Sequence, residues 1–181
     1  MESEVYALLP RNADDVDLDQ MDAVPAGPEV DVVDDLELVG AKERMAVVQI
    51  SGDESSLTFY TNCSLPYLVL HFWNSNRFVS INIALVDDKR QKRVFNLSNK
   101  RSIVTVDKNV CFLPMEVVEG WQRVNLDLGG LLSNAFGTNF VSCLELQVCG
   151  TCKLARAFFQ NKDFADNELP EFLRVCRPDL L

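Results

Sequence analysis

At 181 residues, with 48% hydrophobic and 24% charged residues, the chain has the size and composition of a single soluble globular domain. No run approaches the roughly 20 consecutive apolar residues of a membrane span, and the start of the chain lacks the basic and apolar regions of a signal peptide, so we expect neither a membrane protein nor a secreted one. The formal net charge of -10 comes entirely from residues 1–44, which hold 13 acidic and 3 basic residues, whereas residues 45–181 hold 14 of each.

Residues 1–44 are predicted to form an acidic tail, ahead of a β-sandwich domain over residues 45–181. Like-charge repulsion and the scarcity of aromatic residues argue against independent folding of this segment. Apolar residues are nevertheless scattered among its acids, as in segments that become ordered on a partner. The sequence therefore leaves two interpretations open, a solvated tail or a segment that a partner holds in place.

Short strand patterns follow one another from Met45 onward, at the spacing of an all-β sandwich. In the clearest of them, Phe78 to Val86, apolar residues at every second position alternate with Ser80, Asn82 and Ala84, which predicts one buried face. The other expected strands lie at 47–50, 57–61, 67–73, 94–97, 103–106, 111–115, 121–128, 143–149 and 153–159. Short helical turns are expected only at Gly130–Asn134 and Asn167–Leu173.

We predict an all-β fold, a two-sheet β-sandwich with nine or ten antiparallel strands and minimal helix. Such a domain buries enough apolar surface to fold without a metal or a disulfide, and its six cysteines are expected to be reduced thiols. Gly150-Thr151 suits a two-residue type II′ turn, so the strands at 143–149 and 153–159 are predicted to form an antiparallel hairpin within one sheet.

No catalytic signature accompanies the reactive residue types. His71 is the only histidine and lies in the strand pattern YLVLHFW, where a place on a sheet surface is the simpler interpretation. Cys149 and Cys152 have CxxC spacing, but no second CxxC or histidine pair completes a zinc site, so two thiols flanking a turn are predicted. Asp87-Asp88 and the acids at 163–168 lack the spacing of a calcium loop and are interpreted as turn residues. We therefore predict no enzyme, no cofactor and no metal site.

The most informative surface feature of the domain is a basic cluster, Lys89, Arg90, Lys92 and Arg93. Four charges at a hairpin end form a compact positive surface, which attracts an acidic partner in a salt-dependent way. A solvated hairpin tip is an equally open interpretation. No aromatic residues interleave the charges, so nucleic acid is not a predicted partner. A membrane is not a predicted partner either, because no apolar run is long enough to span one. The acidic segment 1–44 could fold over this cluster and compete with an acidic partner.

Aromatic residues on the strands provide an alternative function. A carbohydrate- or ligand-binding sandwich stacks sugars on exposed rings, although half of the side chains of a strand must face the core. Exposure of Trp73 or Trp121 on a concave sheet face would favour this alternative. The other available rings are Phe59, Tyr60, Tyr67 and Phe78.

Five sequence blocks carry a resemblance to a known family. They are SLPYLVLHFWN, INIALVDDKRQKRVF, LPMEVVEGWQRVNLDL, AFGTNFVSCLELQVCGTCKLARAFF and DNELPEFLRV. From about Ile50 to Pro178 they resemble the cilia- and flagella-associated protein twenty family, the small axonemal proteins of the doublet-microtubule inner junction. Gly120-Trp121, Gly137-Thr138-Asn139 and Glu168-Leu169-Pro170 stand in the family's order and spacing. Residues 1–44 depart from the family pattern and indicate a divergent relative with an acidic N-terminal extension.

The resemblance implies a jelly-roll β-sandwich without enzymatic activity, acting as a structural protein of the ciliary or flagellar axoneme. Its implied partners are tubulin of the doublet microtubules and neighbouring axonemal proteins, and its implied role is to support cilium stability and motility. The basal body and the cytoplasm are further expected locations. An adaptor associated with intraflagellar transport is a second interpretation. Lys89, Arg90, Lys92 and Arg93 are the expected contact with acidic tubulin surfaces.

Overall fold

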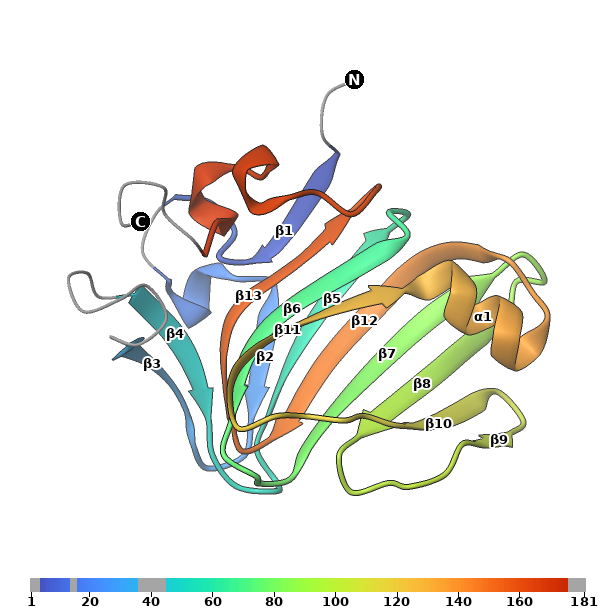
Figure 1. Ribbon diagram of the computed structural model, residues 1–181, viewed down its shortest axis with the longest axis horizontal. Helices are drawn as coiled ribbons and strands as arrows, with labels where there is room; N and C mark the ends of the chain where they lie inside the picture. The colour runs from blue at the N-terminus through green and yellow to red at the C-terminus, as the bar shows by residue number, and fades with distance from the viewer. Residues whose placement is uncertain (1–3, 14–15, 36–44, 176–181) are drawn as a thin grey trace.

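The computed structural model describes residues 4–13, 16–35 and 45–175 and is a sandwich of two β-sheets (Figure 1). The six-stranded sheet has the order β11 (Gly120–Asp127), β6 (Tyr67–Asn74), β13 (Cys152–Gln160), β4 (Met45–Ile50) and β3 (Val30–Asp35), and β1 (Val5–Leu9) also pairs with β13. The seven-stranded sheet has the order β2 (Ala23–Ala26), β5 (Ser56–Cys63), β12 (Phe140–Gly150), β7 (Val79–Asp87), β8 (Lys92–Ser98), β10 (Val110–Pro114) and β9 (Thr105–Asp107). The predicted all-β sandwich is confirmed.

The core lies between the two sheets, where their apolar side chains meet. On β7 the alternation has the predicted outcome, because Val79, Ile81, Ile83 and Leu85 belong to the core and the residues between them lie on the opposite face. Burying one large apolar side chain stabilises the fold by about 1.5–3 kcal/mol. The largest side chains in this core are Phe59, Phe72, Phe95 and Phe159, each at most 1% exposed.

Ten strands, β4 to β13, lie in the region from Met45 onward, in agreement with the predicted nine or ten. The sequence led us to expect antiparallel strands throughout. Instead, β10 runs parallel to β8, with Val110 opposite Val94. Parallel neighbours need a connection long enough to return the chain to the starting end of the sheet. Residues 99–109, which include β9, provide that connection.

The N-terminal segment, predicted as an acidic tail, supplies three further strands. β1 pairs with β13, β2 with β5 and β3 with β4. The carboxylate of Asp35 at the end of β3 accepts a hydrogen bond from the Nζ of Lys153 on β13 at 2.9 Å. The described residues of this segment are therefore held by the chain's own sandwich. Residues 1–3, 14–15 and 36–44 lie outside the described residues.

The predicted hairpin across Gly150-Thr151 is wrong. β12 belongs to the seven-stranded sheet and β13 to the six-stranded sheet, so this turn carries the chain from one layer to the other. Every residue of β13 except Lys153 is buried, and a strand covered on both faces needs a central place in a sheet. A short glycine turn serves a hairpin and a change of layer equally well, and here the burial of β13 favours the change of layer.

One α-helix, α1 (Leu128–Phe136), occurs among the described residues and contains the predicted helical turn. Asp127 caps its first turn, because the Asp127 Oδ1 accepts the backbone N–H of Gly130 at 2.9 Å. Gly137 ends it in the left-handed region, with φ of 65°. None of the helices in the described ranges has the length and apolar character that a membrane crossing requires.

The C-terminal segment covers part of the outer face of the six-stranded sheet. The predicted helix at 167–173 is divided into two 3-10 turns, Asp166–Glu168 and Glu171–Leu173, because Pro170 lies between them. These turns pack on β6 and β13 and form a second, smaller apolar cluster. Its buried members are Val69, Phe158, Phe164, Leu169 and Leu173.

Candidate interaction surface

The turn between β7 and β8 is organised by the carboxylate of Asp87, the last residue of β7. Its Oδ1 accepts the backbone N–H groups of Lys89 and Gln91 at 3.0 and 2.8 Å, and its Oδ2 accepts the Nε of Arg93 at 2.9 Å. Asp87 is 1% exposed, and these bonds compensate the burial of its charge. Arg90 has a φ of 60°, in the left-handed region, within this tightly bonded turn. Asp87 is thus a turn residue, as predicted.

Arg93 is turned into the protein. Besides its bond to Asp87, its Nη1 donates to the Oδ1 of Asn109 at 2.6 Å, and its guanidinium lies over the ring of Phe136, 4.5 Å from the ring centre. Only 16% of the side chain is exposed. Arg93 therefore joins the hairpin to α1 and to the turn between β9 and β10. The structure separates it from the other three cations of the predicted cluster.

Lys89, Arg90 and Lys92 are exposed to solvent, and Lys108 adds a cation that sequence reasoning missed. Lys108 is exposed in the turn between β9 and β10. Because β10 runs parallel to β8 and begins beside it, this turn lies at the same end of the sheet as Lys92 (Figure 1). We call Lys89, Arg90, Lys92 and Lys108 the basic end.

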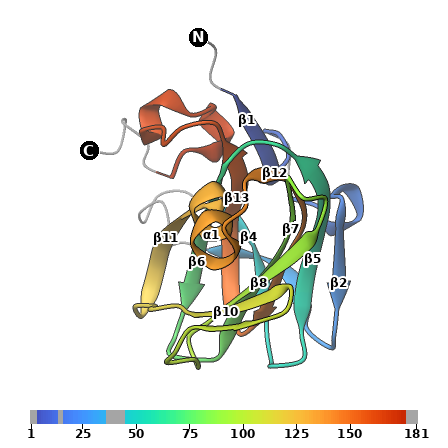
Figure 2. The ribbon, with the colours of Figure 1, turned by 90° about the vertical axis from the view of Figure 1, so that its right-hand side faces the viewer.

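Asp88 fixes the basic end against the segment that follows α1. Its carboxylate accepts the side-chain Nδ2 of Asn139 at 2.8 Å and the backbone N–H of Asn139 at 3.2 Å, and its own N–H donates to the Asn139 carbonyl at 3.0 Å. Asn139 closes the Gly137-Thr138-Asn139 block that contributes to the family resemblance. Figure 2 shows α1 together with β8 and β10 on this side of the molecule. This block therefore positions the hairpin.

Acid is expected to loosen the turn between β7 and β8. Burial raises the pKa of Asp87, but hydrogen bonds from Arg93 and from the N–H groups of Gln91 and Lys89 outweigh it and hold the pKa below its ordinary 3.8. A carboxyl group with a lowered pKa stabilises the folded state above its unfolded pKa, and this contribution is lost as the pH falls through the folded pKa. Protection of the Lys89 and Gln91 amide protons against hydrogen exchange should therefore fall below about pH 4.

Two variants check this acid response. Asp87→Asn removes the titrating group, so the two amide protons should be less protected at neutral pH. Their protection should then not decrease further as the pH falls below about 4. Asp107→Asn, at an exposed position near the same end, should leave the response unchanged. An identical acid response in the Asp87→Asn variant and the unmodified chain would contradict the assignment.

The described part of the acidic N-terminal segment lies away from the basic end. In the seven-stranded sheet, β2 is an edge strand, separated from β8 by β5, β12 and β7. β3 is an edge strand of the other sheet, and Figure 1 shows it on the side of the molecule opposite α1. β2 and β3 therefore do not cover the basic end. The suggested masking also involves residues 1–3, 14–15 and 36–44, which lie outside the described residues.

His71 lies on the outer face of β6 and lines a hollow of about 480 Å³. The carboxylates beside it have other partners, because Asp163 accepts from Arg123 at 3.2 Å and Asp166 from a backbone N–H at 3.0 Å. Burial, followed by the charges of Arg123 and Arg156, lowers the pKa of His71 to about 4, so its imidazole is neutral at pH 7. Within the described ranges no hydrogen bond joins His71 to a carboxylate, hydroxyl or thiol that would make it a general base.

Cys149 and Cys152 have different environments. The Sγ of Cys149, which is half-buried, accepts from the Nδ2 of Asn82 at 3.8 Å, whereas Cys152 is 2% exposed and lies in the core. Burial raises the pKa of both thiols, that of Cys152 to about 12. The five cysteines in the described part of the chain are free thiols, and Cys176 lies outside it. No three His, Cys, Asp or Glu side chains among the described residues are grouped closely enough to hold a metal ion.

Trp73 and Trp121 are cross-strand neighbours on β6 and β11. Both are half-buried, and the Nζ of Lys153 lies 4.8 Å from the centre of the Trp73 ring. Sugar stacking needs an open ring face, and a cation already occupies a face of Trp73. The structure thus lacks the exposed tryptophan that would favour the carbohydrate-binding alternative.

Comparison with known proteins assigns the chain to a family. The model of the CFA20 domain matches residues 34–177. The chain is 30% identical over 141 residues to cilia- and flagella-associated protein 20 of Caenorhabditis elegans, covering 73% of this chain and 70% of that protein. It is 29% identical over 150 residues to the protein of the same name from Chlamydomonas reinhardtii, covering 78% and 79%.

Among solved structures, the chain is similar to a xylan-binding domain of Paenibacillus barcinonensis, with 7% sequence identity and a TM-score of 0.38. The match covers 89% of this chain and 95% of the xylan-binding domain. That similarity is too distant to carry an argument about the ligand. The match to the CFA20 domain, in contrast, extends over β4 to β13 and includes every residue of the basic end. The chain therefore belongs to the CFA20 domain family, whose curated relatives are named as cilia- and flagella-associated proteins.

Proposed function

We propose that this protein is a non-enzymatic structural component of the ciliary or flagellar axoneme, where it binds tubulin of the doublet microtubules and neighbouring axonemal proteins. Its relatives are named as cilia- and flagella-associated proteins, which describes a place in the cell and not a reaction. In this role the sandwich is a rigid piece of the axoneme that supports the stability and motility of the cilium.

The observation that carries this proposal is the basic end. All four cations are exposed. The hydrogen bonds of Asp87 hold the turn with Lys89 and Arg90 in place, and the bond from Arg93 to Asn109 connects β8 to the turn with Lys108. Residues 45–181 have no net charge, so a local cluster provides the attraction to an acidic surface that the overall charge does not. Tubulin presents acidic surfaces, and turns that are already ordered lose little conformational freedom on binding.

Co-sedimentation of the purified chain with microtubules tests the proposal. The chain should pellet with microtubules at low ionic strength. The bound fraction should decrease as salt is added, because exposed charges are screened beyond about 8 Å at physiological ionic strength. A chain that remains in the supernatant at low ionic strength would contradict direct binding to tubulin.

A further inference from the structure

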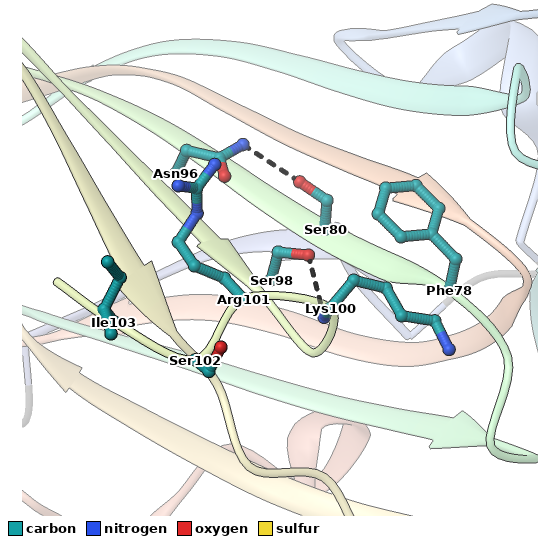
Figure 3. Close-up of a pocket in the computed structure, with 8 residues that line it drawn as sticks. All are labelled: Phe78, Ser80, Asn96, Ser98, Lys100, Arg101, Ser102 and Ile103. Carbon is teal, nitrogen blue, oxygen red and sulfur yellow. Dashed lines mark hydrogen bonds between the residues drawn. The ribbon is translucent and has the colours of Figure 1, made fainter. Parts of the chain in front are cut away.

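A second surface feature lies at the other end of β8, under the segment that joins β8 to β9. It is a hollow of about 510 Å³ on the outer face of the seven-stranded sheet, lined by Phe78, Ser80, Asn96, Ser98, Lys100 and Arg101 among others (Figure 3). We call it the polar pocket. Lys92 and Ser98 are the first and last residues of β8, so the polar pocket lies about 20 Å from the basic end along this strand.

The floor beside the polar pocket is a continuous row of polar side chains across four strands. The Nε2 of Gln147 donates to Thr58 at 3.2 Å, the Nδ2 of Asn82 donates to Gln147 at 3.0 Å, and the Nδ2 of Asn96 donates to Asn82 at 2.5 Å and to Ser80 at 3.1 Å. These bonds fix the orientation of each amide. The Asn96 amide donates through its Nδ2, and none of the described groups donates to its Oδ1, so an acceptor remains available at the pocket.

The wall of the polar pocket is a fixed loop. Asn99 anchors it, since its Oδ1 accepts the N–H of Val79 at 3.0 Å and its Nδ2 donates to the carbonyl of Arg77 at 2.7 Å. The guanidinium of Arg101 lies over Phe112, 4.3 Å from the ring centre. Its Nε is buried and has no hydrogen-bond partner in the described part of the chain. Stacking of this kind holds a guanidinium in one orientation before any ligand binds.

The two cations of the wall lie on different sides of the pocket. Figure 3 shows the Arg101 side chain reaching toward Asn96, whereas the Lys100 side chain extends toward Phe78. None of the described side chains that line the pocket is acidic. The pocket therefore combines two positive charges with fixed amide and hydroxyl groups, and nothing on its lining neutralises the charges.

We propose that the polar pocket binds an acidic peptide segment of a partner protein. A guanidinium presents a planar set of donors that matches a carboxylate, and such charge-assisted hydrogen bonds are stronger than neutral ones. Lys100 pairs with a second acidic side chain of the same segment. The Asn and Ser groups offer the donors and acceptors that a peptide backbone needs. A neutral sugar would leave both cations without a counter-charge, so the charges favour the peptide.

The test measures binding of a fluorescein-labelled glutamate oligopeptide by fluorescence anisotropy, with a glutamine oligopeptide of the same length as the uncharged comparison. The background is the full chain with Lys89, Arg90 and Lys92 changed to glutamine, so that peptide held at the basic end does not contribute. The glutamate peptide should bind and the glutamine peptide should not. Arg101→Gln should weaken binding by about tenfold, which is the effect of losing one charge-assisted hydrogen bond.

Two further variants separate the polar pocket from general electrostatics. Lys100→Gln changes an exposed side chain, leaves the Arg101 stack intact and should also weaken binding. Lys162→Gln removes the same unit of charge at an exposed position that belongs to neither surface and should change the affinity by less than about twofold. Equal binding of the two peptides, equal effects of Arg101→Gln and Lys162→Gln, or displacement of the peptide by a neutral oligosaccharide would overturn the proposal.

This inference is independent of the binding to tubulin proposed above, and the two can fail separately. Co-sedimentation of the Arg101→Gln variant with microtubules reports on the basic end alone, and we expect it to match that of the unmodified chain. If the Arg101→Gln variant no longer binds the peptide but still binds microtubules, the polar pocket is supported as a separate site. If this variant also loses microtubule binding, both assays report on one surface, and the proposal of a separate pocket is overturned.

Discussion

Changing Lys89, Arg90 and Lys92 to glutamate should lower the affinity of the chain for microtubules by about a hundredfold or more. Each change removes an attraction and places a like charge against an acidic surface, which costs more than simple neutralisation. The three side chains are exposed, so the fold should be retained, and circular dichroism should show an unchanged thermal transition. Microtubule co-sedimentation at several salt concentrations measures the effect, and the variant should show little salt dependence.

A matched control uses exposed cations elsewhere on the surface. Arg77 and Lys162 are exposed, and Arg77 lies before β7, at the end of that strand remote from the hairpin. Changing both to glutamate alters the net charge in the same direction. The control should lower the affinity for microtubules only slightly, through the change in net charge, and far less than the hairpin variant does. A loss as large as that of the hairpin variant would contradict a specific role for the basic end.

Gly150→Ala, which adds a single methyl group, is expected to lower the free energy of unfolding substantially. An added Cβ would lie 2.2 Å from the carbonyl oxygen of Phe78, and the backbone has a φ of +98°. Left-handed strain and the steric overlap together should cost about 3 kcal/mol or more. The unfolding temperature should fall by roughly 6–12 °C, which thermal denaturation followed by circular dichroism would measure.

Gly129→Ala is the matched control for this effect. Gly129 lies in α1, and an added Cβ would meet its nearest atom, the Oδ1 of Asp127, at 3.5 Å, an ordinary contact distance. Alanine is better than glycine in a helix by about 0.5–1 kcal/mol. The control should therefore leave stability unchanged or raise it. If the two alanine variants unfolded at the same temperature, the close approach of Gly150 to Phe78 would not be a feature of the protein.

The faces of single strands could be predicted from the sequence, whereas the sheet to which a strand belongs could not. The alternation on β7 depends only on neighbouring residues, so Ile81 and Ile83 were placed in the core correctly. The turn at Gly150-Thr151 looks the same whether the chain stays in one sheet or changes layer. The burial of β13 on both faces, including the C-terminal turns on its outer side, depends on residues that are distant in sequence.

The N-terminal segment shows how charge can obscure a strand. β3 has the sequence VDVVDD, in which Val30 and Val32 alternate with Asp31, a period-two signal that the acidic composition outweighed. β3 pairs with the next strand, β4, and its last residue, Asp35, contacts Lys153, which lies 118 residues further along the chain. Composition alone carries no information about such partners.

The basic end could be predicted only in part, because only some of its residues are neighbours in the sequence. Lys89, Arg90 and Lys92 follow one another closely, so their grouping needs no tertiary structure. Arg93 belongs to the same run, but Asp87 and Phe136 draw it inward, and only the packing of α1 reveals this. Lys108 joins the basic end through the parallel pairing of β10 with β8. The Asp-Lys-Asn turn at 107–109 was a local signal for an exposed cation, but not for its neighbours.

Carbodiimide cross-linking of detergent-extracted axonemes would reveal whether the basic end contacts tubulin, because carbodiimide joins lysine to carboxylate only at direct contact. Detergent removes the membrane and matrix, so a transport-associated adaptor would be lost and an axonemal component retained. We predict that the chain stays with the doublet microtubules and that Lys89, Lys92 or Lys108 is joined to acidic residues of tubulin. Release of the chain by detergent, or cross-links to tubulin only from distant lysines such as Lys162, would contradict it.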